Sequence, residues 1–162
     1  MSILLSSAEI FDLAKAVEKG GQAFYQAIAS TTSSAELREL FTHLAGEEVK
    51  HFHTFERLAR EYPELEVDAE EWGQTSAYIQ ATSDSRFFVG EDKALALAKT
   101  VKDPLKAVDI AIAFEKDTLL FFYELLGVTP AKGREAARAI IEEEKRHVQL
   151  LSQRRKRLAE AG

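Results

Sequence analysis

Four stretches of this 162-residue chain place apolar residues at every third or fourth position, and each pattern holds one glutamate near its middle. This spacing puts the side chains on one face of an α-helix, which is then buried against other helices. The glutamates within the apolar faces are Glu18, Glu48, Glu115 and Glu144. We therefore predict an all-α fold, a four-helix bundle whose core receives one carboxyl group from each helix.

Capping signals set the expected helix boundaries. Ser6 and Ser33 are each followed three residues later by a glutamate, which is the capping-box pattern of a helix start. Asp103 and Thr129 each precede a proline, which suits the first position of a helix. With these starts, the predicted helices span 7–30, 34–61, 104–126 and 130–159.

The connections between these helices predict the topology. The first and third connections are only a few residues long, so each joins an antiparallel hairpin. The crossover, residues 62–103, is too long for a structureless loop in a compact domain, and we expect one or two short helices in it, the clearer one over 93–101. The crossover residues expected to cover the flank of the bundle are Trp72, Tyr78, Phe87 and Phe88. Residues 1–162 would then form a single domain, with the third long helix parallel to the second.

Two histidines complete the pattern of core glutamates. His51 and His147 each follow a core glutamate by three residues, one turn further along the same face. The four glutamates lie at similar depths in their helices, so the six side chains should meet at one level of the bundle. Glu47 and Glu143 would reach the same histidines from four residues away, but they fall beside the apolar faces.

A metal site explains why carboxyl groups stand in the core. Four buried carboxylates repel one another and lose their hydration, and no lysine or arginine lies on these faces at the same level. Two divalent cations would balance the four negative charges, and imidazole favours iron, manganese or zinc over calcium or magnesium. The chain has no cysteine, which leaves oxygen and nitrogen ligands. The predicted metal ligands are Glu18, Glu48, His51, Glu115, Glu144 and His147.

Two lone glutamates and two Glu-x-x-His motifs on four helices resemble the pattern of the ferritin-like di-iron carboxylate superfamily. The Ala-x-Glu-Lys sequences around Glu18 and Glu115 resemble rubrerythrin-like domains in particular. The resemblance implies a ferritin-like fold that binds two iron ions, although manganese or zinc would suit the same ligands. It also implies two ligand pairs, one for each ion, and a bridging pair: Glu18 with His51, Glu115 with His147, and Glu48 with Glu144 between the ions.

The sequence departs from the rubrerythrin pattern in two places. It lacks a cysteine-ligated rubredoxin domain, and Ile112 stands where rubrerythrins carry an additional glutamate one turn before Glu115. Both departures count against a rubrerythrin-type peroxidase. The resemblance implies a di-iron oxidoreductase that reacts with hydrogen peroxide or dioxygen and receives electrons from an external donor. A non-enzymatic iron binding or storage protein and a di-iron hydroxylase resembling the ubiquinone-biosynthesis family stay open as alternatives.

Tyr25 and Gly21 lie beside the predicted metal site. Tyr25 is two turns beyond Glu18 on the same face, where it is a candidate to donate a hydrogen bond to a metal ligand or to relay electrons. The alternative is a core tyrosine with a satisfied hydroxyl group. Gly21, one turn from Glu18, leaves space that either admits a small oxidant or lets two helices approach closely.

The formal net charge of −6 argues against a general nucleic-acid binder, because phosphate binding needs clustered lysine and arginine. The basic run at residues 154–157 is expected to be a solvated helix end. The chain has no apolar run long enough to span a membrane, and its first residues lack the charge and length of a signal peptide. We therefore expect a cytoplasmic protein without nucleic-acid or membrane partners, which forms a homodimer or a larger homo-oligomer.

Overall fold

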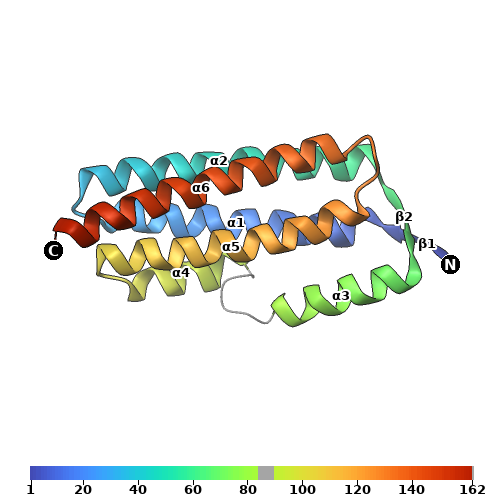
Figure 1. Cartoon of the computed structure of the whole chain (residues 1–162), viewed down its shortest axis with the longest axis horizontal. Coiled ribbons are helices and arrows are strands. Elements are labelled where there is room, and N and C mark those ends of the chain that lie inside the picture. Colours follow the sequence, from blue (N-terminus) through green and yellow to red (C-terminus); the bar gives the residue numbers. More distant parts are fainter. Residues whose placement is uncertain (84–89, 162) are drawn as a thin grey trace.

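Four long helices pack side by side in the computed structural model, which describes residues 1–83 and 90–161. They are α1 (Ser7–Thr31), α2 (Ala35–Glu61), α5 (Pro104–Val128) and α6 (Arg134–Ala161). α1 and α2 form one antiparallel hairpin, α5 and α6 form another, and α5 runs parallel to α2 (Figure 1). The prediction of an all-α four-helix bundle with a long crossover is confirmed.

Side chains cap two of the helix starts, at the predicted Asp103 and at Ser34, next to the predicted Ser33, whereas the Ser6 side chain makes no capping hydrogen bond. Ser34 caps α2 by accepting a hydrogen bond from the Leu37 amide (3.3 Å). Asp103 caps α5 by accepting one from the Leu105 amide (3.2 Å). The cap of α2 is therefore one residue later than the predicted Ser33.

α6 begins four residues later than the predicted start at Pro130. The hydroxyl of Thr129 donates back to the Leu125 carbonyl (2.7 Å), so this side chain does not cap the next helix. The chain then turns, with the amides of Gly133 and Arg134 both donating to the Pro130 carbonyl. The regular helix starts only after this turn.

The crossover contains a strand and two helices: β2 (Glu64–Asp68), α3 (Ala69–Ser83) and α4 (Gly90–Thr100). The two helices agree with the expectation, and α4 includes most of the predicted 93–101. β2 pairs antiparallel with an N-terminal strand, β1 (Ser2–Ser6), with Ser2 opposite Asp68 and Ser6 opposite Glu64. The sequence pattern does not reveal this sheet, because each strand has only five residues and its partner lies far away in the chain.

The crossover helices lie along the flank of the bundle. α4 packs along α1, and α3 contacts α5 and β2 (Figure 1). Among the aromatic residues expected on this flank, Trp72 packs against the core and Tyr78 is half-buried, whereas Phe87 and Phe88 lie outside the described residues. None of the described helices is both long enough and apolar enough to cross a membrane.

The basic run at residues 154–157 lies near the end of α6. Arg154 pairs with Glu36 of α2, and Arg155 pairs with Asp109 of α5. Two of the four cations therefore connect α6 to its neighbours, where the sequence predicts only a solvated helix end.

Aromatic layers close the core on both sides of its middle. Near the two strands, the Phe55 ring packs against Phe11 and Phe122, with centroid distances of 6.3 and 5.0 Å. Toward the opposite end of the bundle, the Tyr25 ring stacks on Phe41 at 5.7 Å. The core glutamates lie between these two layers, so the bundle holds its polar residues in the middle of an apolar interior.

Candidate metal centre

The six predicted ligands come together in the middle of the bundle. Each long helix contributes one glutamate, and α2 and α6 add His51 and His147 one turn further along. The four glutamates are fully buried, and the two histidines are only 1% and 2% exposed. Because each glutamate replaces an apolar residue within a packed helix face, burial of that face carries its carboxyl group into the core.

The donor atoms of these residues form two groups, within each of which all atoms lie within 4.8 Å of one another. The groups are Glu18, Glu48, His51 and Glu144, and Glu48, Glu115, Glu144 and His147. Ligand atoms on opposite sides of one ion, with bonds of about 2.0–2.2 Å, are about 4.0–4.4 Å apart. Each group therefore needs only a small contraction to enclose one cation. Glu48 and Glu144 belong to both groups, as two bridging carboxylates would.

Glu144 shows this sharing most directly. Its Oε1 lies 2.9 Å from Nδ1 of His51, and its Oε2 lies 2.8 Å from Nδ1 of His147. The outer carboxyl groups are close to the same nitrogens: Glu18 Oε2 is 3.6 Å from Nδ1 of His51, and Glu115 Oε1 is 3.3 Å from Nδ1 of His147. Both imidazole rings thus turn Nδ1 toward the shared carboxyl group.

Most of these donor atoms lack other partners. Among the described residues, ten buried side-chain nitrogen or oxygen atoms have no aligned hydrogen bond, and nine of them belong to the six residues of the centre. The tenth is the hydroxyl oxygen of Thr118. Buried polar atoms are normally satisfied, so nine orphaned donor atoms in one place fit a pair of cations that they bind together. The residues of the centre therefore fit a di-metal site.

Burial shifts the pKa of three of the four buried carboxyl groups upward, which favours their protonated form when no cation is bound. Burial, reinforced by the charge of Glu144, raises the pKa of Glu18 and of Glu48 well above the ordinary value. The same causes raise the pKa of Glu115 to about 8.

Glu144 behaves in the opposite way. Burial alone would raise its pKa, but the close contacts with the rings of His147 and His51 lower the pKa well below the ordinary value. Burial lowers the histidine pKa values in turn, but the contacts with Glu144 outweigh it and raise the pKa of His51 to about 9. Contacts with Glu115 and Glu144 likewise raise the pKa of His147 to about 10. Glu144 is therefore a carboxylate between two imidazolium rings, whose protons a metal ion would displace.

Tyr25 contacts the centre from the aromatic layer. Its Oη donates a hydrogen bond to Oε1 of Glu115, and the residue is fully buried. Its ring stacks on Phe41 and meets Phe114 edge-on. Burial, with the charge of Glu115, raises the pKa of Tyr25 well above the ordinary value, so the hydroxyl keeps its proton. Tyr25 is thus both a core tyrosine and a hydrogen-bond donor to a predicted ligand.

Glu47 and Glu143 lie outside both groups of donor atoms. Oε2 of Glu143 is 2.6 Å from Nε2 of His51, the ring nitrogen that faces away from Glu144. Glu47 instead forms an ion pair with Lys50 (2.6 Å). The sequence pattern does not reveal the contact between Glu143 and His51, because the two residues are on different helices and lie 92 positions apart.

Gly21 lets α1 approach the centre closely. A Cβ atom at this position would lie 2.7 Å from Oε2 of Glu48 and 2.9 Å from a ring carbon of Phe114. Between the two interpretations of Gly21, the structure supports close helix approach, because neighbouring side chains already fill the space beside it.

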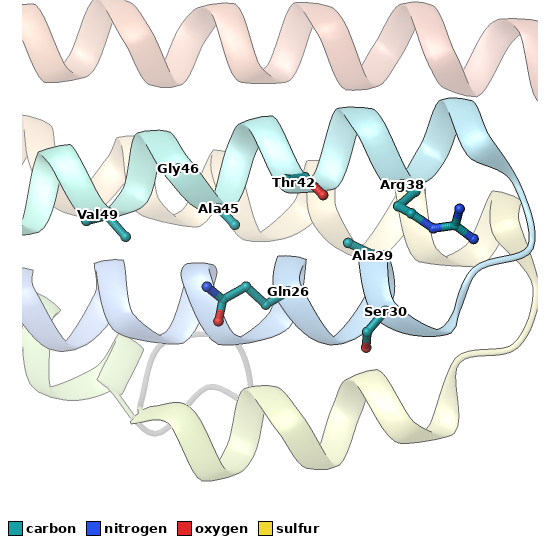
Figure 2. Close-up of a pocket in the computed structure, with 8 residues that line it drawn as sticks. All are labelled: Gln26, Ala29, Ser30, Arg38, Thr42, Ala45, Gly46 and Val49. Atoms are coloured by element: carbon teal, nitrogen blue, oxygen red, sulfur yellow. The ribbon is translucent and has the colours of Figure 1, made fainter.

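Two described surface pockets contain no residue of the centre. A pocket of about 410 Å³ lies between α1 and α2, and its lining residues include Gln26, Arg38 and Thr42 (Figure 2). A second, of about 440 Å³, lies at the end of the bundle, where the α1–α2 connection meets residues 98–107. The six residues are therefore set apart from both pockets.

Comparisons with known proteins agree with this fold. A crystal structure of a Thermotoga maritima protein, described as a ferritin-like diiron-carboxylate protein, matches the chain with a TM-score of 0.69 and 22% identity. The match covers 94% of this chain and 95% of that chain, and at this identity it establishes the fold alone. No curated protein sequence matches the chain. The sequence pattern of the rubrerythrin family matches residues 9–154, so the chain belongs to the rubrerythrin family.

Proposed function

We propose that the protein is a non-haem di-iron oxidoreductase that reacts with hydrogen peroxide or dioxygen, as a peroxidase or a ferroxidase. The observation that carries this proposal is the pair of buried four-residue groups that share Glu48 and Glu144. Membership of the rubrerythrin family supports it. The Thermotoga protein with the same fold is itself described as a diiron-carboxylate protein, which supports the choice of iron.

The two groups suggest how the ligands are divided between the ions. We assign one ion to each outer pair and the shared pair to both: Glu18 with His51, Glu115 with His147, and Glu48 with Glu144 as bridges. Four carboxylates and two divalent ions are together neutral, which removes the repulsion of the buried charges. Manganese and zinc accept the same ligands, but zinc has no redox chemistry, so the oxidoreductase proposal favours iron or manganese, and iron first.

Two ferrous ions held in this way would supply one electron each, which with two protons reduce one hydrogen peroxide to two waters. The chain's own contribution is to place the ligands and to exclude bulk water with the aromatic layers on both sides. Tyr25 Oη holds a proton against Glu115 Oε1, where it offsets changes of charge at that carboxylate. The 162 residues include no cysteine and hence no thiolate-bound iron centre, so we propose that an external donor restores the electrons.

Anaerobic loading followed by rapid mixing tests the proposal. The protein is loaded with two ferrous ions per chain and mixed with hydrogen peroxide or with air-saturated buffer, and the ferric absorption is followed. Oxidation that is faster than that of free iron, and faster with peroxide than with air, supports a peroxidase. The reverse preference supports a ferroxidase, and oxidation no faster than that of free iron with either oxidant contradicts the proposal.

The storage and hydroxylase alternatives predict different results in the same assay. A storage protein would take up and oxidise many more than two iron ions per chain. A hydroxylase would couple dioxygen consumption to an organic substrate, which must reach the metals through an apolar channel. The two described surface pockets contain no residue of the centre, so neither supports such a channel.

A further inference from the structure

The two histidines of the centre have the same inner contacts but different outer contacts. Nδ1 of each ring faces Glu144, at 2.9 Å for His51 and 2.8 Å for His147. The outer nitrogen of His51 lies 2.6 Å from Oε2 of Glu143. Within the described part of the chain, the outer nitrogen of His147 has no such carboxylate partner.

The sequence provides a counterpart for this carboxylate in the other half of the bundle. Glu47 stands four residues before His51, as Glu143 stands four residues before His147. Glu143 reaches across from α6 to the histidine of α2, so the equivalent contact would join Glu47 of α2 to His147 of α6. Glu47 is instead held at 2.6 Å by Lys50. The correspondence between Glu47 with His51 and Glu143 with His147 in the sequence is therefore not matched by equivalent contacts in the structure.

A carboxylate on the outer nitrogen has a defined effect on an imidazole ligand. When a metal ion displaces the proton on Nδ1, Glu143 would accept the remaining hydrogen, on Nε2, so that the lone pair of Nδ1 faces the centre. It also fixes the plane of the ring and increases the basicity of the ligand nitrogen. Glu143 itself is one-third exposed, and its Oε1 lies 3.7 Å from Nη2 of Arg146.

We propose that Glu143 is a positioning residue for His51 and makes the Glu18–His51 half of the centre the tighter of two unequal metal positions. The inference rests on the proposed di-metal function. The half that contains His147 lacks this support, so its metal binds more weakly and second. Loss of such an outer carboxylate lowers metal affinity by about 10- to 100-fold. We expect the metal affinities of the two halves to differ by the same factor.

Stepwise titration with Co²⁺ tests this order of binding, because its visible absorption reports the ligand set. The wild-type protein is compared with Glu143→Gln and with Glu47→Gln as the matched control, since both residues precede a ligand histidine by four positions. We expect wild type to bind two Co²⁺ ions in separable steps. Glu143→Gln should weaken the first step by about 10- to 100-fold and change its spectrum, whereas Glu47→Gln should change neither.

A second measurement follows the His51 ring itself. In the protein loaded with Zn²⁺, the Nε2–H of His51 should give a slowly exchanging, downfield proton signal in ¹H–¹⁵N spectra. Glu143→Gln should shift this signal and speed its exchange, which a general loss of stability would not do selectively.

The outcomes separate the inference from the function on which it rests. An unchanged first step and an unchanged His51 signal in Glu143→Gln would overturn the positioning role while leaving the di-metal site intact. Equal losses in Glu143→Gln and Glu47→Gln would overturn the inequality of the two halves. If the wild-type protein binds no Co²⁺, the proposed function and the inference fail together.

Discussion

Replacing Gly21 with alanine should damage the centre through a single methyl group. The new Cβ would lie 2.7 Å from Oε2 of Glu48 and 2.9 and 3.1 Å from two ring carbons of Phe114. The Glu48 carboxyl group can swing away, but the Phe114 ring is buried and packed edge-on against Tyr25. The substitution therefore tests whether the carboxyl group of Glu48, which belongs to both groups of donor atoms, can move without loss of metal binding.

Two opposing effects determine the size of the change. Alanine in place of a helical glycine stabilises by about 1 kcal/mol, whereas an extra methyl group in a filled core costs about 1–3 kcal/mol. The free energy of unfolding of metal-free Gly21→Ala should then be about 0–2 kcal/mol lower than that of the metal-free wild type. Metal affinity should fall at least about tenfold, because Oε2 of Glu48 must leave its position.

Gly20→Ala is the matched control. Among the described residues, a Cβ atom at Gly20 would meet only backbone atoms of Gly90, at 3.9 Å, which is an ordinary contact. The free energy of unfolding of this variant should be higher than that of wild type by about 0.5–1 kcal/mol, and its metal affinity should equal that of wild type. Urea unfolding of the metal-free proteins measures the free energy of unfolding of each variant, and Co²⁺ titration measures its metal affinity. If the two alanine variants behave alike in both assays, the close approach of Gly21 to Glu48 has no functional meaning.

Three further predictions concern the centre itself. Glu144→Ala should abolish binding of the metal pair while leaving the helical circular dichroism unchanged, and two bound metals in this variant would rule out the bridging assignment. Metal-free protein should lose stability as pH rises from about 4.5 to 8, because folded Glu115, with a pKa of about 8, keeps a proton that the unfolded chain releases. The two histidines extend this loss from about pH 6.5 to 10, since their pKa values are also raised. A urea midpoint that is constant or rises over this range would show that the carboxyl groups are not buried together. Tyr25→Phe should keep both metals but slow peroxide-driven oxidation, and an unchanged rate would limit Tyr25 to packing.

The long helices could be predicted because their pattern is local. A face such as that of α2 repeats apolar residues over many turns, and the helix then follows from burial of that face. The β1–β2 sheet could not be predicted, because its five-residue strands are paired by the tertiary fold and not by any pattern of their own. The start of α6 was predicted wrongly. The Thr129 hydroxyl could either cap the following helix or donate to the preceding helix, and in the structure it donates to the carbonyl of Leu125.

The six residues of the centre could be predicted from their position within the apolar faces. Periodicity places Glu144 inward and Glu143 beside it, and the structure agrees with both placements. Periodicity cannot say which outer carboxylate meets which ring, because this depends on how α2 and α6 are rotated against each other. Only the structure therefore shows that Glu143 contacts His51. It also shows that Glu47 pairs with Lys50 and not with His147.

Metal content per chain is the most direct test of the central claim. Protein purified from iron-replete cells and then reloaded anaerobically with ferrous iron should retain close to two ions per chain after desalting. The Glu144→Ala protein, treated identically, should retain none. If wild-type protein retains no metal after loading with iron, manganese or zinc, the buried glutamates and histidines do not form a metal centre and the account is wrong.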